Sequence, residues 1–486
     1  MSSCSTSSLA LDSQSAVERT PPEIIDYIFA LGSSNICFGS SIPFPLLVSH
    51  VCGRWRDIAL SSSHLWSTVA CTQSAPRFPI LKLLLKRSRN HPLDLHFDFN
   101  FPKGYVETYP HLLPHNSHSK HPFSDSEYES TSYLTDSDKI SKRLSLLTTS
   151  HNPRIRSFSV SSTNYTYISL SIRSFPRGPN PHLSSFEVSY VPGHEEISRR
   201  GTLNFPLNRD GVASSLKRLK LRSVDLNWAS TSKRLAGLKS LELGDHMSGT
   251  WRSYGRLQTI LASTPSLETF ILDNPGSLSM IEEWPKDVVV ELPCLRRMVL
   301  AKQRAEVAVA ILSRLRLPAV KWLEINLSNR TSMARERRGV GMHDEIIRLL
   351  VPLVKRVEVV RMCEVHPHER VARALLAGMS SLRVLILDSD RDACNRGLHP
   401  CALSPVIDFL SHSTLSHSSH SPLFVPHLSH LVLPSYGIDQ KQDYLAPVIE
   451  CRPNSFDIYA PTETDMLDTE SILSKIGYKC GVVDEQ

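Results

Sequence analysis

Residues 216–221 of this chain read LKRLKL, and residues 238–243 read LKSLEL. In both stretches apolar residues stand at the first, fourth and sixth positions, so the last two alternate with polar residues, as in a strand that buries one face. The same spacing recurs in ten copies, which begin at Ile155, Leu183, Leu216, Leu238, Leu267, Leu295, Val320, Val354, Leu382 and Leu428. Because such short strands bury their apolar face only against neighbouring copies, the repetition predicts strands packed side by side along one shared core.

The copies begin 22 to 34 residues apart, except for a wider gap before the last one. Segments with helical periodicity lie between copies, at 254–262, 306–315, 344–353 and 370–376. This period and the LxxLxL spacing resemble leucine-rich repeats. The resemblance implies an α/β fold in which each copy supplies one parallel strand and one return helix. An open α/β layer protein with a less strict strand order is the alternative, since both folds alternate parallel strands with helices.

The copies also depart from the regular leucine-rich repeat at the turn that follows each strand. Regular repeats carry an Asn or Cys three positions after the third apolar residue, where its side chain satisfies backbone groups. Here those positions hold Val224, His246, Pro275 and Gln303. We therefore expect no ladder of such side chains, and an irregular solenoid with uneven curvature.

A different pattern precedes the repeats, between residues 20 and 69. Thr20-Pro21-Pro22-Glu23 predicts a helix start, with Thr20 as the cap and Glu23 completing a capping box. Ile24, Ile28 and Leu31 then share one face of that helix.

A second helical pattern opens at Pro45, Gly53 marks a kink or a junction between helices, and a third short turn closes at Leu65-Trp66. Three short helices of about fifty residues bury little surface by themselves. We therefore expect a partner or an adjoining domain to cover the remaining apolar face.

This segment resembles an F-box through an ordered set of residues: Pro22-Glu23-Ile24, Ile28-Phe29, Val51-Cys52, Trp55-Arg56, Ile58-Ala59 and Leu65-Trp66. The pattern differs from the family at Thr20, where a leucine is usual, and at 32–43, where the break between helices is longer. A helical N-terminal cap with the tryptophans in its own core is the alternative reading.

The resemblance implies docking on a Skp-type adaptor. By motif position the adaptor contacts would come from Pro22, Ile24, Ile25, Ile28, Phe29, Val48, Val51, Cys52, Trp55 and Trp66. Some of these side chains must instead form the small internal core, and the sequence does not sort the two groups.

An F-box-like segment followed by leucine-rich-like repeats resembles the F-box/leucine-rich-repeat proteins, in the style of the F-box families of mushroom-forming fungi. The resemblance implies a substrate receptor of an SCF (Skp–cullin–F-box) ubiquitin ligase, joined through the adaptor to cullin and holding a target protein on its repeats. Such a receptor has no catalytic residue of its own and acts by holding the target near the ubiquitin-charged conjugating enzyme. The alternatives are an interaction scaffold that joins no ligase and, less favoured, a nucleic-acid-associated protein.

Composition gives no sign of catalysis or of a dedicated nucleic-acid binder. The chain has 486 residues, with 54 Lys and Arg against 48 Asp and Glu, a net charge of +6, which is small for this length. No phosphate-binding glycine loop, nucleophile elbow or HExxH motif occurs, so we expect no enzyme activity and no cofactor.

The serine-rich N-terminus is not a secretory signal, and no apolar run is long enough to span a membrane. Ten dispersed cysteines are typical of reduced thiols in a cytosolic or nuclear protein.

Two groups of potential metal ligands occur in loop-like sequence: His111, His115, His118 and His121, and then Cys394, His399 and Cys401. Prolines interrupt the first group, and no second pair of ligands accompanies the other, so we expect no metal site.

The expected organisation is a disordered N-terminus (1–17), an F-box-like helical domain (18–72), a connecting helix, strand and flexible loop (73–150), the repeats (151–460) and a C-terminal cap or tail (461–486).

Overall fold

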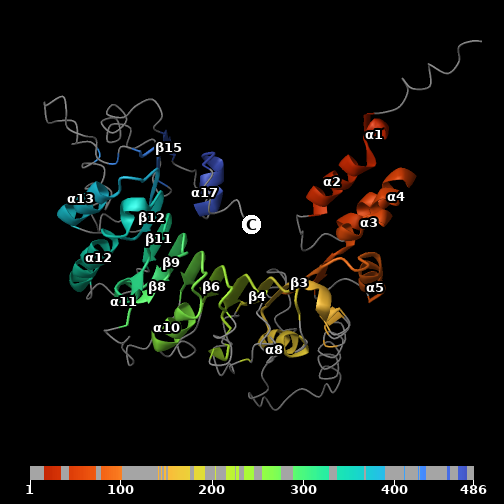
Figure 1. Ribbon diagram of the computed structural model, residues 1–486, viewed down its shortest axis with the longest axis horizontal. Helices are drawn as coiled ribbons and strands as arrows, with labels where there is room; N and C mark the ends of the chain where they lie inside the picture. The colour runs from red at the N-terminus through yellow and green to blue at the C-terminus, as the bar shows by residue number, and fades with distance from the viewer. Residues whose placement is uncertain are drawn as a thin grey trace, which may run out of the picture. The chain divides into compact units, whose positions relative to one another are not determined.

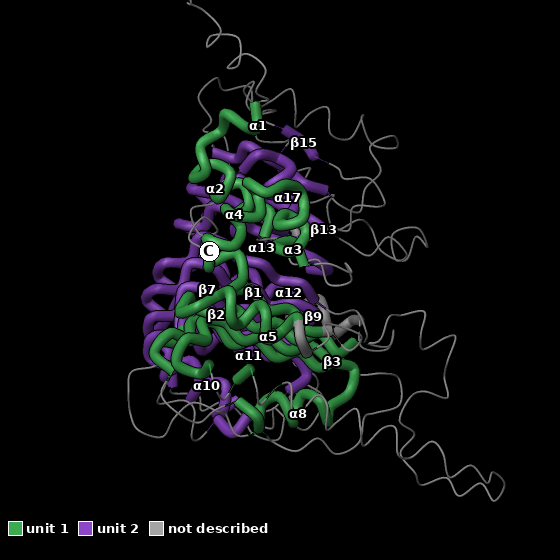
Figure 2. Tube along the Cα trace, turned by 90° about the vertical axis from the view of Figure 1, so that its right-hand side faces the viewer, with its two compact units in different colours: residues 1–216 green, residues 217–486 purple. Residues whose placement is uncertain are grey.

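The computed structural model describes residues 16–33, 43–72, 78–100, 151–175, 180–191, 215–224, 226–228, 235–245, 254–274, 288–327, 336–365, 368–388, 427–433, 457–459 and 469–478, with residues 141, 144, 147, 148, 203, 410 and 425. They belong to two compact units, residues 1–216 and 217–486 (Figure 2).

The first unit begins with short helices, as the sequence predicts. They are α1 (Ala16–Arg19), α2 (Pro22–Ser33), α3 (Phe44–Ser49), α4 (Gly53–Ser61) and the 3-10 helix η1 (Ser63–Trp66). Cys52 caps the junction between α3 and α4, because its Sγ accepts a bond from the Trp55 backbone N–H at 3.4 Å. The Phe29 ring meets Trp55 edge-on at 5.0 Å between centroids. The Trp66 indole N–H donates to the Ala59 carbonyl at 2.7 Å, so this buried ring has its polar atom satisfied.

The predicted role of Thr20 as the cap of α2 is wrong. Its hydroxyl donates to the Ala16 carbonyl at 2.8 Å, at the end of α1. The carbonyl of Pro21 instead accepts the first helical bonds of α2, from the backbone N–H groups of Ile24 and Ile25. The short helix α1, which begins inside the range expected to be disordered, offers the Thr20 hydroxyl a nearer acceptor.

Four parallel strands of the first unit pair in sequence order: β1 (Thr68–Thr72), β2 (Leu93–Phe99), β3 (Ile155–Ser162) and β4 (Ser185–Tyr190). Helices α5 (Phe78–Arg87) and α8 (Tyr165–Ser174) and the 3-10 helix η3 (Asn152–Arg154) join them. Leu93, Leu95, Phe97 and Phe99 are buried at alternate positions of β2. Parallel pairing therefore starts at β1, well before residue 151, where the sequence predicts the repeats to begin.

The second unit, taken by itself, has nine described parallel strands in sequence order: β5 (Arg218–Arg222), β6 (Ser240–Gly244), β7 (Thr269–Asp273), β9 (Arg297–Gln303), β11 (Trp322–Leu327), β12 (Val359–Cys363), β13 (Val384–Asp388), β14 (His430–Val432) and β15 (Asp457–Tyr459). A separate short pair joins β8 (Val290–Glu291) to β10 (Leu315–Arg316).

The helices of the second unit lie on both sides of its strands. Those on one side are α10 (Tyr254–Ala262), α11 (Ala305–Leu312), α12 (Glu336–Leu350) and α13 (Glu369–Gly378), while α17 (Thr469–Lys475) lies on the other (Figure 1). The first four correspond to the four predicted return helices. The repeat architecture is thus an α/β fold like that of leucine-rich repeats.

Strand register corrects one predicted copy. Val360 and Met362 of β12 pair with Leu323 and Ile325 of β11, so with Val357 they form the buried set. The sequence assigned this copy to Val354, Val357 and Val359, but Val354 begins the 3-10 helix η6 (Val354–Arg356). Buried valines on both faces of β12 make the register ambiguous from sequence.

At the turns after the strands, backbone groups make hydrogen bonds to the neighbouring strand, where regular repeats use a ladder of asparagine side chains. Ser223, Asp245 and Asn274, each directly after a strand, have positive φ of 54°, 47° and 41°, and their N–H groups donate to carbonyls of the next strand. At one of the four ladder positions a polar side chain nevertheless satisfies backbone carbonyls, that of Gln303. Its Nε2 donates to the carbonyls of Leu272 and Ala301 at 2.9 and 2.8 Å.

Two groups of potential metal ligands fall outside the described residues: the histidines of 111–121 and the Cys394–Cys401 group. Within the described ranges, no cluster of three or more His, Cys, Asp or Glu is arranged to hold a metal ion. None of the helices described is both long and apolar enough to cross a membrane.

Candidate protein-binding surfaces

An apolar stripe runs along α2 and reaches α3. Its members are side chains between 51% and 62% exposed, namely Ile24, Tyr27, Ile28, Leu31, Leu47 and Val51. The four on α2 are spaced by three, one and three residues, which places them on one helical face. Monomeric proteins rarely leave such clusters exposed, so this stripe is a candidate docking surface.

The structure sorts the ten residues predicted to contact an adaptor. Those buried in the helical segment are Ile25, Phe29, Val48 and Trp66; those exposed are Pro22, Ile24, Ile28, Val51 and Cys52; and Trp55 is half-buried against Phe29. The buried group forms the internal core and is unavailable to a partner. Tyr27, Leu31 and Leu47 were missing from the predicted set. The helical spacing of Tyr27 and Leu31 with Ile24 and Ile28 is the signal that would have included them.

The second candidate surface is the face of the strands that alternates with the buried LxxLxL residues, here called the second face. In the first unit it is polar and built mostly of short side chains: Asp94, His96 and Asp98 on β2, Ser157, Ser159 and Ser161 on β3, and Ser185, Glu187 and Ser189 on β4. Burial lowers the pKa of His96, against the opposing effect of Asp94 and Glu187.

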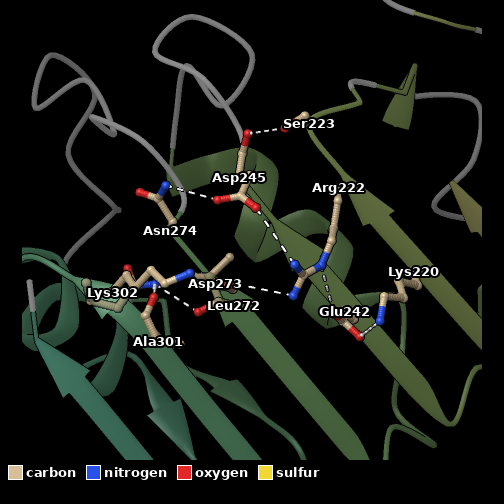
Figure 3. A network of polar contacts seen from close by, with 11 residues as sticks. Lys220, Arg222, Ser223, Glu242, Asp245, Leu272, Asp273, Asn274, Ala301 and Lys302 are labelled. Carbon is tan, nitrogen blue, oxygen red and sulfur yellow. Dashed lines mark hydrogen bonds and ion pairs between the residues drawn. The ribbon is translucent and has the colours of Figure 1, made fainter. Parts of the chain in front are cut away.

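In the second unit, Arg222 at the end of β5 is the centre of a charged network on this face (Figure 3). Its Nε lies 3.1 Å from Glu242 and its Nη2 lies 3.3 Å from Asp273, while Asp245 stands 3.9 Å away. Partial burial lowers the pKa of Arg222, but Glu242, Asp273 and Asp245 outweigh it and raise the pKa overall.

The network reaches two lysines and is balanced in charge. Lys220 pairs with Glu242 at 2.9 Å, and Lys302 pairs with Asp273 at 3.4 Å. Three cations thus face three carboxylates. Because each of these cations has a carboxylate of the same face beside it, the network leaves little free positive charge for phosphates.

Comparisons with known proteins add a distant structural similarity. No protein-family model matches the chain, and no curated protein matches it in sequence. Among solved structures, the chain is similar to the leucine-rich repeat-containing protein LegL7 from Legionella pneumophila, with a TM-score of 0.30 and 9% identity over 79% of this chain and 98% of that one. The class of the fold, a leucine-rich-repeat-like α/β repeat protein, rests on the parallel register of its own strands.

Proposed function

We propose that this protein is the substrate-recognition subunit of an SCF-type ubiquitin ligase. Its N-terminal helices would dock on a Skp-type adaptor, and through it on cullin, while the repeats hold a target protein. The chain would supply no catalytic group. It would raise the local concentration of the target near the ubiquitin-charged conjugating enzyme.

The observation that carries the adaptor half of the proposal is the apolar stripe of α2 and α3. Seven of the nine large hydrophobic side chains that are exposed in the described residues lie between Val17 and Val51. The core beneath them is complete, with Phe29 and Trp66 almost fully buried. The helical core therefore forms without the side chains of the stripe. Clustered aliphatic and aromatic side chains are the types that contribute most binding energy when a partner desolvates them.

The repeats support the second part of the proposal, that this protein holds a target. Parallel strands stacked in sequence order present a continuous row of variable side chains at the positions between the buried ones, which suits recognition of an extended protein surface. The matched charges around Arg222 favour a protein target over a nucleic acid, whose binding needs unpaired cations.

A pull-down of the purified full chain with a Skp-type adaptor tests the docking surface. We expect the double variant Ile24→Lys/Ile28→Lys to weaken adaptor binding at least tenfold, because both side chains lie on the stripe and are about half exposed. Val289→Lys is the matched control, since Val289 is also an exposed aliphatic residue but lies in the second unit. Equal binding by both variants, or no binding by the wild-type chain, would contradict the proposal.

Ile28 is a better test position than Trp55. The Trp55 ring packs against Phe29, so its removal disturbs the helical core together with any interface. Loss of binding by a Trp55 variant would therefore not separate docking from folding.

A further inference from the structure

The C-terminal helix α17 covers part of the second face in the second unit, on the side of the strands opposite α10–α13 (Figure 1). Its Ile472 and Leu473 are buried, and they pack in one cluster with strand side chains of β11 to β14: Trp322, Val359, Val384, Ile386 and Val432. Tyr459, Ile476 and Tyr478 border this cluster. The sequence predicts a cap or tail at 461–486, and the described part of it, α17, packs on the second face of the strands.

Polar contacts fix the helix at its first turn. Glu470 forms an ion pair with Arg297 of β9, whose side chain is largely buried. The Thr469 hydroxyl donates to Glu324 at 2.8 Å and accepts a bond from Arg361, also at 2.8 Å. The first turn of the helix thus pairs Glu470 with Arg297 of the strands, and the next turn places Ile472 and Leu473 in the apolar cluster.

The strand surface beneath α17 is organised by its own contacts. Arg361 pairs with Glu324 at 3.5 Å and with Asp388 at 3.0 Å, both on neighbouring strands. The Arg297 guanidinium lies 4.1 Å from the centroid of the Trp322 ring, a cation–π contact. The carboxylate opposite Arg297, by contrast, comes from α17. Without the helix, this surface would be a preformed apolar patch with an arginine at one end.

We propose that this surface is a helix-binding site which α17 occupies in the isolated chain. A partner helix would take its place by presenting a carboxylate followed, two and three residues later, by aliphatic side chains, as Glu470, Ile472 and Leu473 do. Apolar grooves that accept an amphipathic helix are a common mode of recognition. Three buried side chains of α17, Thr469, Ile472 and Leu473, have to offset the ordering of a seven-residue helix, which leaves a small net stabilisation and makes α17 replaceable. The inference rests on the target-binding half of the proposed function and not on adaptor docking.

A fluorescein-labelled peptide of residues 469–478 tests the site on the full-length protein by fluorescence polarisation. Ile472→Asp/Leu473→Asp places charge in the cluster and releases α17, so we expect this protein to bind the peptide at least tenfold more tightly than the wild type. Ser474→Asp is the matched control, because Ser474 is exposed on the same helix and its change leaves the cluster intact. A peptide with Glu470→Lys should bind about tenfold more weakly, since it opposes Arg297.

Equal affinity for the three proteins, or no binding to the double variant, would overturn the inference. Hydrogen exchange of the wild-type chain tests it without any substitution. The amides of α17 should exchange at least tenfold faster than those of β12, and equal protection would contradict a replaceable helix. Neither experiment contains an adaptor, so their failure would leave the docking proposal untouched.

Discussion

At the scale of single residues, Gly244 shows how one position shapes the charged network. It lies in β6 between Arg222 of β5 and Asp273 of β7, in register with both. A Cβ at Gly244 would lie 3.2 Å from Cγ of Arg222. The absence of a side chain lets the arginine cross its neighbouring strand and reach the carboxylate beyond it.

Cys363, at the end of β12, provides a prediction about reactivity. Burial, reinforced by Asp388 and Glu364, raises the pKa of its thiol to about 12. Because a raised pKa keeps the thiol protonated until the pH approaches that value, the reactive thiolate is on the order of 10⁻⁴ of the population at pH 8. We expect iodoacetamide at pH 8 to modify the exposed Cys294 well before Cys363.

Peptide mass spectrometry of alkylated protein measures both sites at once. The rate at Cys363 should rise about tenfold for each pH unit between 8 and 10 while the fold persists, since the thiolate fraction rises in that proportion. Labelling of Cys363 as fast as that of Cys294 at pH 8 would show that its thiol is neither buried nor surrounded by negative charge.

Two neighbouring residues of α2 show what the sequence alone does not determine. The sequence identified the apolar residues of the N-terminal helices but could not tell Ile28 from Phe29, which are adjacent, equally apolar and opposite in exposure. Their separation depends on where α3 and α4 pack against α2. That packing is a tertiary property which helical periodicity leaves open.

At the scale of elements, the turns after the strands are a recurring device of this fold. Residues there adopt the left-handed backbone conformation, which Asn and Asp tolerate better than other residues with a side chain. Asp245 and Asn274 suit it, whereas Lys302, which adopts the same conformation within the end of β9 with a φ of 52°, carries some strain.

Substitution at Lys302 tests the cost of the left-handed conformation at the end of β9. Lys302→Val should lower the free energy of unfolding by about 1–2 kcal/mol relative to Lys302→Asn, because a β-branched side chain is least compatible with the left-handed region. Both variants remove the contact between Lys302 and Asp273, so the comparison isolates the backbone effect. The midpoints of urea unfolding measure the difference, and equal midpoints would show that the backbone at the end of β9 relaxes without cost.

Elements with a long apolar period, or with a short one that recurs along the chain, were predictable, and isolated short elements were not. Helix α10 spans the predicted range, and the other three predicted return helices appear with shifted ends. Strand β1 reads TVACT and α17 reads TESILSK, and neither is long enough for its period to be distinctive.

At the scale of the whole molecule, the chain combines two kinds of surface with different chemistry. The helical segment carries exposed aliphatic side chains over a complete core. The second unit carries a second face that is charged and balanced near Arg222 and covered by α17 near Trp322. An apolar surface suits a constant partner and a varied face suits a selective one, and the ligase receptor proposed above would use both.

The architecture followed from the sequence because the LxxLxL copies are numerous and each reports the same geometry. The sequence did not show what binds to each surface. Residues that face a partner obey no period, and the contacts of α17 join positions more than one hundred residues apart.

Affinity purification of the tagged full chain from cells, followed by mass spectrometry, tests the central claim most directly. The wild-type chain should recover a Skp-type adaptor, a cullin and a target protein together. Ile24→Lys/Ile28→Lys should lose the adaptor and the cullin while retaining the target, and Val289→Lys should retain all three. Recovery of the adaptor without cullin would indicate a scaffold outside any ligase, and a wild-type chain that recovers no adaptor would contradict the account.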